Sequence, residues 1–192
     1  MLSERQQEII EVSIDIIANK GIQGLTIKNL SKEIGISEPA IYRHFESKTD
    51  ILLAILNNFQ EMAVFMNEAV LEMEDTAIEK ISFMFSKIIE IFSKEPSHIS
   101  VVFSEEIFKN EEKLKNKIIE LMTLKEQAIE QIILQGQEKG EVRTDIDNKT
   151  LALIVMGALR FTVKQWDLRK QQENLIEEGN KLIDALKAIL SN

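Results

Sequence analysis

Hydrophobic residues recur every three or four positions along most of the chain, a spacing that places them on one face of an α-helix. These stretches are separated by glycines at Gly21/Gly24, Gly35 and Gly136/Gly140, and the chain holds only two prolines. The pattern predicts an all-α protein of about nine helices. The expected helices run from Ser3 to a left-handed cap at Gly21, from Thr26 to Gly35, from Ser37 onward, from Ser47 or Asp50 to about Met73, and near 76–94, 98–109, 111–138, 147–170 and 173–190.

The expected helix starts carry side chains that can accept a hydrogen bond from a free backbone N–H. Ser3, Thr26, Ser37 and Asp147 stand at such positions. Pro39 fits the first turn after Ser37, because a missing N–H costs nothing there. The first helix is expected to bury a face made of Ile9, Ile10, Ser13, Ile16 and Ile17.

The composition changes near residue 50, after which phenylalanine and methionine become frequent. A length of 192 residues allows one domain or two small ones. We therefore expect a small N-terminal domain over residues 1–48 and a larger helical bundle over residues 49–192, joined through the fourth helix.

The charge balance limits where a polyanion could bind. With 23 Lys and Arg against 32 Asp and Glu the net charge is −9, so any nucleic-acid surface must be local.

The absence of cysteine removes disulfides and thiolate chemistry and fits a reducing compartment. The start lacks the features of a signal peptide, and the longest apolar stretch, Leu151–Leu159, is about half of a membrane span. We expect a soluble, cytoplasmic protein that does not enter a membrane.

Residues Thr26–Phe45, with the sequence TIKNLSKEIGISEPAIYRHF, predict a short helix, a tight turn at Gly35–Ser37 and a second short helix. Leu30, Ile34 and Ile41 would supply the contact between the two helices. Such a helix-turn-helix can lay its second helix in the major groove of DNA. From Lys20 to Lys48 the chain carries five basic and three acidic side chains, a local balance of +2.

From Gln6 to Leu56 the chain resembles the DNA-binding domain of the TetR family of transcriptional regulators. The family pattern ILxxAxxLFxxxGxxxTxxxxIAxxxGVSxxxxYxHFxxKxxLL stands here as IIEVSIDIIANKG, TIKNLSKEIGIS and AIYRHFESKTDILLAIL. The matched residues are Gly21, Thr26, Gly35, Ser37, Tyr42, His44, Phe45 and Lys48. The departures are Ser13 and Ser31 in place of alanines, Ile17 in place of phenylalanine, and a larger residue at Ile34.

The resemblance implies that Tyr42 and His44 contact the DNA backbone and that Lys48 contacts a phosphate. Thr26 stands at a helix start, where its hydroxyl and nearby N–H groups can meet a phosphate. The residues expected to bind DNA are Thr26, Lys28, Ser37, Glu38, Pro39, Ala40, Tyr42, Arg43, His44 and Lys48.

Three of these residues have more than one interpretation. Arg43 could reach a phosphate or a guanine edge, and Glu38 could accept from a cytosine amino group or point away from the DNA. His44 could also be an ordinary packed or solvated histidine at a helix end.

The sequence offers no catalytic signature such as GxSxG, a P-loop or GxGxxG. The two histidines lie far apart and there are no cysteines, so no metal-ligand spacing occurs, and His98 is expected to be solvated. We expect no enzyme activity, no metal and no cofactor.

The C-terminal part is rich in phenylalanine and methionine, which at helical spacing usually form plain core. The resemblance implies an effector pocket in this domain, and these residues suit an adaptable apolar cavity for a small apolar or amphipathic effector. The candidate lining residues are Phe65, Phe83, Phe103, Met122, Phe161 and Trp166.

The helix near 147–170 is apolar nearly all round, which a helix on the surface of a monomer cannot sustain. Burial within the chain would explain this, but with the last helix it resembles the dimerisation pair of the family. The interface candidates are Leu153, Met156, Gly157, Arg160, Leu182 and Leu186.

These features predict a homodimeric, sequence-specific DNA-binding regulator, a ligand-responsive repressor that binds a palindromic operator. The alternative is a chromosome-associated or cell-division factor whose C-terminal domain contacts a protein. An enzyme or a structural adaptor would need a site assembled from distant helices.

Overall fold

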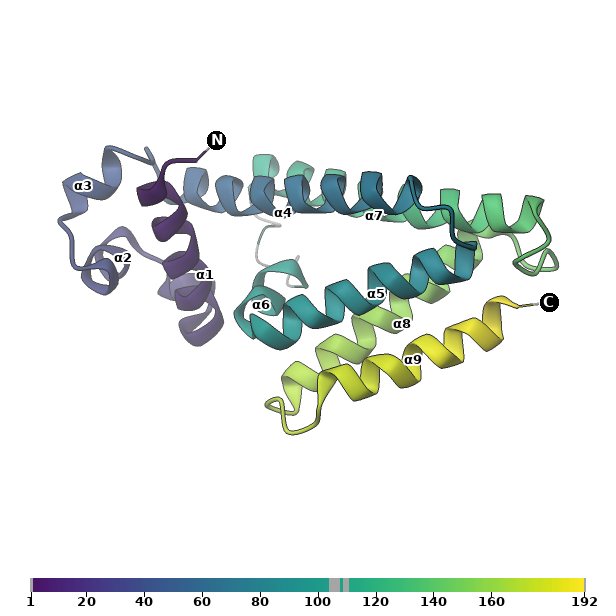
Figure 1. The fold of residues 1–192 in the computed structure, drawn as a ribbon. Helices are drawn as coiled ribbons and strands as arrows, with labels where there is room; N and C mark the ends of the chain where they lie inside the picture. Colours follow the sequence, from purple (N-terminus) through teal and green to yellow (C-terminus); the bar gives the residue numbers. More distant parts are fainter. Residues whose placement is uncertain (1, 104–107, 109–110, 192) are drawn as a thin grey trace. The chain divides into compact units, whose positions relative to one another are not determined.

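The computed structural model describes residues 2–103, 108 and 111–191, and the elements of this part are all helical. Figure 1 labels α1 (Glu4–Gly24), α2 (Ile27–Ile34), α3 (Glu38–Tyr42), α4 (Lys48–Leu71), α5 (Ala77–Lys94), α6 (Ile99–Val102), α7 (Glu112–Glu138), α8 (Asn148–Leu168) and α9 (Leu175–Leu190). A 3₁₀ turn, η1 (Pro96–His98), precedes α6. The predicted all-α fold is confirmed.

Helix starts follow the predicted capping chemistry at most positions. The hydroxyl of Ser3 accepts from the N–H of Gln6 at 3.2 Å, and the carboxylate of Asp147 accepts from the N–H of Thr150 at 3.0 Å. Ser37 differs, because it stands at the N-cap of α3 but its side chain makes no capping bond. Its hydroxyl is therefore not committed to the helix start.

One predicted helix end is confirmed in part and another was wrong. Gly21 interrupts the first helix with a positive φ, at φ 68° and ψ 174°, but one more helical turn follows to Gly24. The helix predicted over 98–109 is interrupted, because α6 ends at Val102 and Phe103 has left the helical conformation. Residues 104–107 and 109–110 of that prediction lie outside the described residues.

The chain forms two compact units, residues 1–61 with 97–121 and residues 62–96 with 122–192. This division does not coincide with the predicted boundary after residue 48, because α4 and α7 each contribute to both units. The predicted boundary divides the chain by function, and as such it stays a prediction.

The first unit is built around the apolar face of α1. The predicted buried residues Ile9, Ile10, Ser13, Ile16 and Ile17 are all buried, and the Ser13 hydroxyl donates to the Ile9 carbonyl at 2.6 Å. Leu30 of α2 and Ile41 of α3 join this core with no exposed surface, and α6 packs against α1. The face of α3 opposite Ile41 is thereby turned outward.

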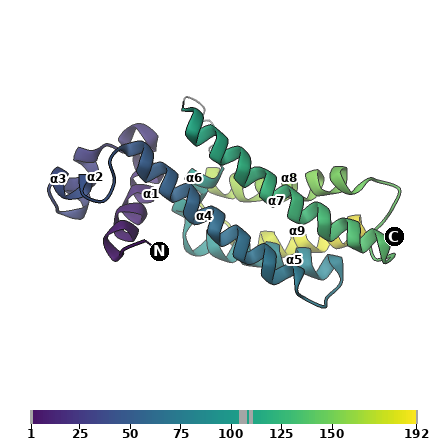
Figure 2. The same ribbon diagram turned by 90° about the horizontal axis from the view of Figure 1, so that it is seen from above.

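The second unit is centred on α5, α8 and α9, which lie side by side in both views (Figures 1 and 2). The approach of α9 to α5 is close, because a Cβ at Gly179 would lie 2.3 Å from the Cδ1 of Ile89. Glycine at this position therefore sets the distance between the two helices.

Among the described helices, none combines the length and the apolar character that crossing a membrane requires.

Candidate nucleic-acid interface and apolar face

The turn between α2 and α3 is fixed by a left-handed glycine. Gly35 has φ 79° and ψ 30°, a conformation that costs a residue with a side chain about 1–2 kcal/mol. The N–H groups of Gly35 and Ile36 both donate to the Ser31 carbonyl at 3.0 Å, which closes the end of α2. The chain is thus reversed at the point where the second helix of the motif must begin.

The outward face of α3 holds the residues predicted to contact DNA. Tyr42 is 51% exposed although it is a large aromatic residue, and Arg43 is exposed beside it. Ser37, Glu38 and Pro39 at the start of α3 are exposed as well. We call the exposed set Ser37, Glu38, Pro39, Tyr42 and Arg43 the reading face; Ala40 is half-buried beside it.

The cations around the reading face differ in their pairing. Lys20 forms an exposed ion pair with Glu33, with 3.5 Å between nitrogen and oxygen. Lys28, Lys32 and Arg43 are exposed, and none forms an ion pair within the described part of the chain. Three positive charges therefore remain for phosphates, although the whole chain is acidic.

Thr26 is exposed at the N-cap of α2. Its oxygen accepts from the Asn29 N–H at 3.1 Å, so the hydroxyl proton remains to be donated elsewhere. Lys28 lies two residues further along, in the first turn of α2, with its side chain exposed. Both positions suit contacts to a phosphate group.

His44 is half-buried at the end of the motif. Its carbonyl accepts from the Gln6 side-chain amide at 3.5 Å, and it borders an open hollow of about 330 Å³ with Gln6, Phe45 and Asp50 among the lining residues. It is less accessible than the reading face, and its predicted backbone contact stays a prediction.

Lys48 is not a free surface lysine. Its ammonium donates to the Ile22 carbonyl at 2.7 Å, and partial burial lowers the pKa of Lys48. The next residue, Thr49, donates its hydroxyl to the Glu111 carboxylate at 2.8 Å. Neither contact could be predicted from the sequence, because they join residues 26 and 62 positions apart.

The candidate effector residues are not gathered around a common cavity. Phe65 is 74% and Phe161 67% exposed, and Phe83 and Met122 are exposed too. Phe103 is half-buried and belongs to the first compact unit, whereas the other five belong to the second.

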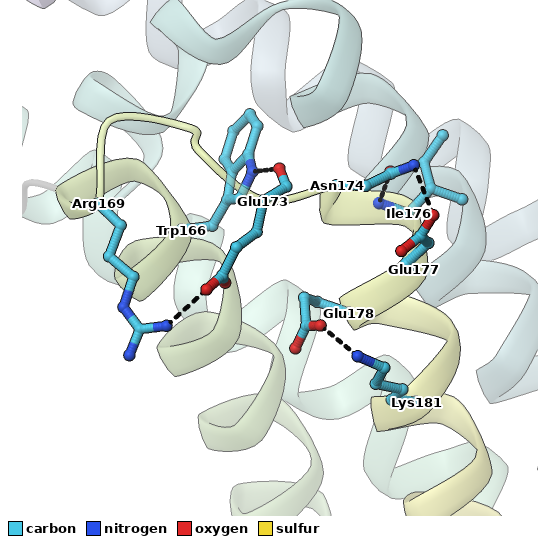
Figure 3. Close-up of polar contacts among 8 residues, drawn as sticks. All are labelled: Trp166, Arg169, Glu173, Asn174, Ile176, Glu177, Glu178 and Lys181. Carbon is cyan, nitrogen blue, oxygen red and sulfur yellow. Dashed lines mark hydrogen bonds and ion pairs between the residues drawn. The ribbon is translucent and has the colours of Figure 1, made fainter.

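Trp166, the sixth candidate, has a structural contact. Its ring is buried, and its indole N–H donates to the Glu173 carbonyl at 2.7 Å across the turn between α8 and α9 (Figure 3). The turn itself contains two non-glycine residues with positive φ, Lys170 at 56° and Gln171 at 59°. Trp166 thus stabilises a turn of unfavourable backbone conformation.

The outer face of α8 is apolar and exposed. Leu153 is 68% and Leu168 71% exposed, and nothing lies within 4 Å of a Cβ placed at Gly157. With Phe161 these residues recur at helical spacing, and we call Leu153, Gly157, Phe161 and Leu168 the α8 outer face. The opposite side of α8, including Leu151, Val155 and Leu159, is buried within the chain.

The other interface candidates differ in how far they are exposed. Arg160 is exposed, and Met156 and Leu182 are half-buried. Leu186 is only 3% exposed and lines the narrow space between α5 and α9. It therefore belongs to the core of the second unit, which corrects its placement at an interface.

His98 also departs from its prediction. It is half-buried, and its ring meets that of Phe59 edge-on, with 5.3 Å between centroids and an interplanar angle of 81°. The prediction of a solvated histidine was wrong, since η1 brings the ring against α4.

Two family models match consecutive parts of the chain. One described as "Bacterial regulatory proteins, tetR family" matches residues 9–55, and one described as "YsiA-like protein, C-terminal region" matches residues 58–188. Together they cover the motif and both of the helices predicted to form the dimer contact.

Known proteins resemble the chain over nearly its whole length. The fatty acid metabolism regulator protein of Bacillus subtilis is 22% identical over 188 residues, 98% of this chain and 96% of that protein. The nucleoid occlusion factor SlmA of Vibrio atlanticus is 22% identical over 165 residues, 85% of this chain and 84% of that protein.

Solved structures show the same fold. The regulator FadR of Bacillus subtilis in complex with stearoyl-CoA superposes with a TM-score of 0.81 at 22% identity, covering 96% of this chain and 98% of that one. The ketosteroid regulator KstR2 of Mycobacterium tuberculosis superposes with a TM-score of 0.84 at 15% identity, covering 100% of this chain and 97% of that one.

Proposed function

The chain belongs to the TetR family of bacterial transcriptional regulators, which bind DNA and are not enzymes. We propose that it is an effector-controlled repressor that acts as a homodimer on a palindromic operator. The observation that carries this proposal is the reading face: α3 buries Ile41 and leaves Tyr42 and Arg43 outward beside unpaired lysines. Such a regulator works where the chromosome is, in the cytoplasm.

Each residue of the site has a physical role in this proposal. Tyr42, Ser37 and the proton of Thr26 donate hydrogen bonds to phosphate oxygens, and Lys28 and Arg43 add charge. Arg43 also has the bidentate geometry that reads a guanine edge, whereas Glu38 disfavours phosphate and suits a cytosine amino group. Phosphate contacts then set the position of α3, and the start of α3 discriminates bases.

Two copies are required for a palindrome. The α8 outer face exposes apolar side chains that a second copy would cover, and a two-fold axis would then present two reading faces to successive major grooves about 34 Å apart. Arg160, Met156 and Leu182 lie at the borders of this surface in the proposal.

We further propose a long-chain acyl thioester, such as a fatty acyl-CoA, as the effector class. The related FadR of Bacillus subtilis was solved with stearoyl-CoA, and the second unit here exposes Phe65, Phe83 and Met122, apolar surface that an acyl chain would cover. The effector changes the output only if it binds the DNA-competent and DNA-incompetent arrangements with different affinities.

The test is binding of the purified protein to duplexes from around its own gene, titrated with salt and then with stearoyl-CoA. We expect a specific complex that weakens steeply with salt and that stearoyl-CoA dissociates at micromolar concentrations. Stearic acid and free coenzyme A serve as controls for the two parts of stearoyl-CoA. No preference over random duplex would end the proposal of a regulator, and specific binding that ignores stearoyl-CoA would end only the effector class.

The similarity to SlmA favours a second candidate, a chromosome-associated factor whose C-terminal unit contacts a protein. Genome-wide occupancy separates the two. One or a few promoter sites support the repressor, and many scattered sites support the alternative.

A further inference from the structure

The first turn of α4 is tied to its surroundings on two sides. Lys48 donates its ammonium to the Ile22 carbonyl in the last turn of α1, at 2.7 Å. Thr49 donates its hydroxyl to the Glu111 carboxylate, directly before α7, at 2.8 Å. Both distances lie within the normal range of hydrogen bonds, and all four residues belong to the first compact unit.

The position of Lys48 is unfavourable unless it has this partner. A cation in the first turn of a helix faces the positive end of the helix dipole, and partial burial further disfavours the charge. The Ile22 carbonyl lies at the end of α1, where the dipole is negative. The contact therefore joins the positive end of α4 to the negative end of α1 through one ammonium group.

Ile22 is part of the junction that leads into the reading motif. Its carbonyl also accepts from the Leu25 N–H at 3.2 Å, and the Asn29 side chain donates to the Gly24 carbonyl at 2.8 Å. Thr26 then caps α2 within the same few residues. A displacement of Ile22 therefore moves the start of α2.

Glu111 is in turn part of the start of α7. Its carbonyl accepts from the Lys115 N–H at 2.9 Å, as the residue before a helix does, and its carboxylate is half-buried against Thr49. A displacement of the start of α7 is therefore transmitted to Thr49 and, through the peptide bond, to Lys48.

From these contacts we propose that Lys48 and Thr49 form a clamp, a pair of positioning residues that fixes α1–α2 to the starts of α4 and α7 and so sets where each reading face is held in the dimer. This rests on the proposed function. In this proposal Lys48 acts on DNA through the Ile22 carbonyl and not through a phosphate.

The clamp predicts a loss of affinity for the palindrome that a single half-site does not show. In Thr49→Val the hydroxyl is replaced by a methyl group of similar size, and loss of one partly buried hydrogen bond to a carboxylate weakens palindrome binding by roughly tenfold. Half-site binding stays within about twofold, because the reading face itself is unchanged. Thr49→Ser keeps the hydroxyl and is expected to bind the palindrome with wild-type affinity. Glu111→Gln keeps an acceptor and should reduce the affinity only slightly, whereas Glu111→Ala should reduce it as much as Thr49→Val.

The matched controls are Thr123→Val and Lys113→Met, exposed positions on α7 with the same chemical changes. Lys48→Met is expected to reproduce the loss seen for Thr49→Val with the salt dependence unchanged. A salt slope lower by about one would instead assign Lys48 to a phosphate, and equal losses on palindrome and half-site would overturn the clamp.

Failure of the clamp and failure of the proposed function can be told apart. If the wild-type protein does not prefer a palindrome, the proposed function fails, and amide hydrogen exchange of the free protein decides on the clamp. Thr49→Val must then speed exchange over residues 22–29 at least fivefold relative to Thr123→Val. Unchanged exchange in this segment would overturn the clamp by itself.

Discussion

The reading face on α3 and the α8 outer face are both exposed, but their chemistry is opposite. Around α3 the outward groups are a phenol, a guanidinium, a serine hydroxyl and unpaired lysines. On α8 they are leucine, phenylalanine and an open glycine. Polar donors and cations are well solvated, so their exposure to water costs little free energy. Exposure of large apolar side chains is unfavourable, and Phe161 and Leu168 are 67% and 71% exposed.

The two helices also differ in what holds them. The five-residue α3 depends on Ile41, which is fully buried, and on the Gly35 turn before it. The 21-residue α8 buries a whole side of its own against the chain and still has an apolar side left over. A short helix with one anchor suits a polar ligand that needs little area, and a long helix with two apolar sides suits a second copy.

The largest effect is expected from charges on the α8 outer face. Leu153→Glu combined with Phe161→Glu places two carboxylates where the proposed dimer would cover two apolar side chains, each contributing about 1.5–3 kcal/mol. The dimer dissociation constant should rise by at least about a hundredfold, measured by analytical ultracentrifugation. Helix content by circular dichroism should stay the same, because both side chains are exposed in the single chain.

Leu134→Glu on α7 is the control for this change, since Leu134 is an exposed leucine outside the α8 outer face. It should leave the dimer intact. If the double variant also stays dimeric, the α8 outer face is not the dimer interface.

The next effect is expected on the reading face. Tyr42→Phe removes the phenol donor and Arg43→Gln removes the guanidinium charge, and each should cost operator affinity by about 1–3 kcal/mol. The salt dependence separates them: Arg43→Gln should lower the slope by about one when it contacts a phosphate, whereas Tyr42→Phe should not. Fluorescence anisotropy at several salt concentrations measures both quantities, and neither variant should change the dimer.

Periodicity sufficed to predict the buried side of α1 and the inward residues of α2 and α3. The face of α1 and the inward Leu30 and Ile41 follow from spacing alone, because burial depends on the local repeat. The all-round apolar character of α8 also predicts that a second copy covers its exposed side, and this stays a prediction. The position of Leu186 was harder, since α9 is packed on two other helices and its pattern does not tell which neighbour each leucine meets.

Contacts between distant residues could not be predicted in this way. Lys48 reads from the sequence as a surface cation, and only the fold shows that the end of α1 lies within reach of its ammonium. The exposure of Phe65 and the contact of His98 with Phe59 also depend on how helices cross. Residue type and spacing therefore predicted which residues of α3 lie outward but not the contacts of Lys48 and Thr49.

A smaller effect is expected at Gly157 and would sharpen the assignment of the α8 outer face. In a chain made monomeric by Leu153→Glu and Phe161→Glu, Gly157→Ala should stabilise α8 by up to about 1 kcal/mol, because nothing lies within 4 Å of the added methyl group. In the otherwise unchanged dimer the same methyl group should obstruct close helix approach and raise the dissociation constant several-fold. Thermal unfolding and ultracentrifugation compare Gly157 with Gly157→Ala in the monomeric and in the dimeric protein. A gain in stability in both, with no rise in the dissociation constant, would mean that no second helix approaches Gly157.

The smallest effect is expected from acid, and it should reach α8 before α3. A hydrogen bond from the Thr150 side chain, followed by one from its backbone, lowers the pKa of the Asp147 cap below its ordinary value of 3.8, whereas the start of α3 has Ser37, which does not titrate. The folded-state pKa is depressed, so this cap stabilises the protein above the unfolded-state pKa and its contribution is lost as the pH falls through the folded-state value. The stability difference between wild type and Asp147→Asn, measured by urea unfolding from pH 6 to pH 3, should therefore shrink only at the acid end. Ser37→Ala at the start of α3 should show no such trend, because neither side chain titrates. A trend of equal size there would mean that acid does not distinguish the two helices.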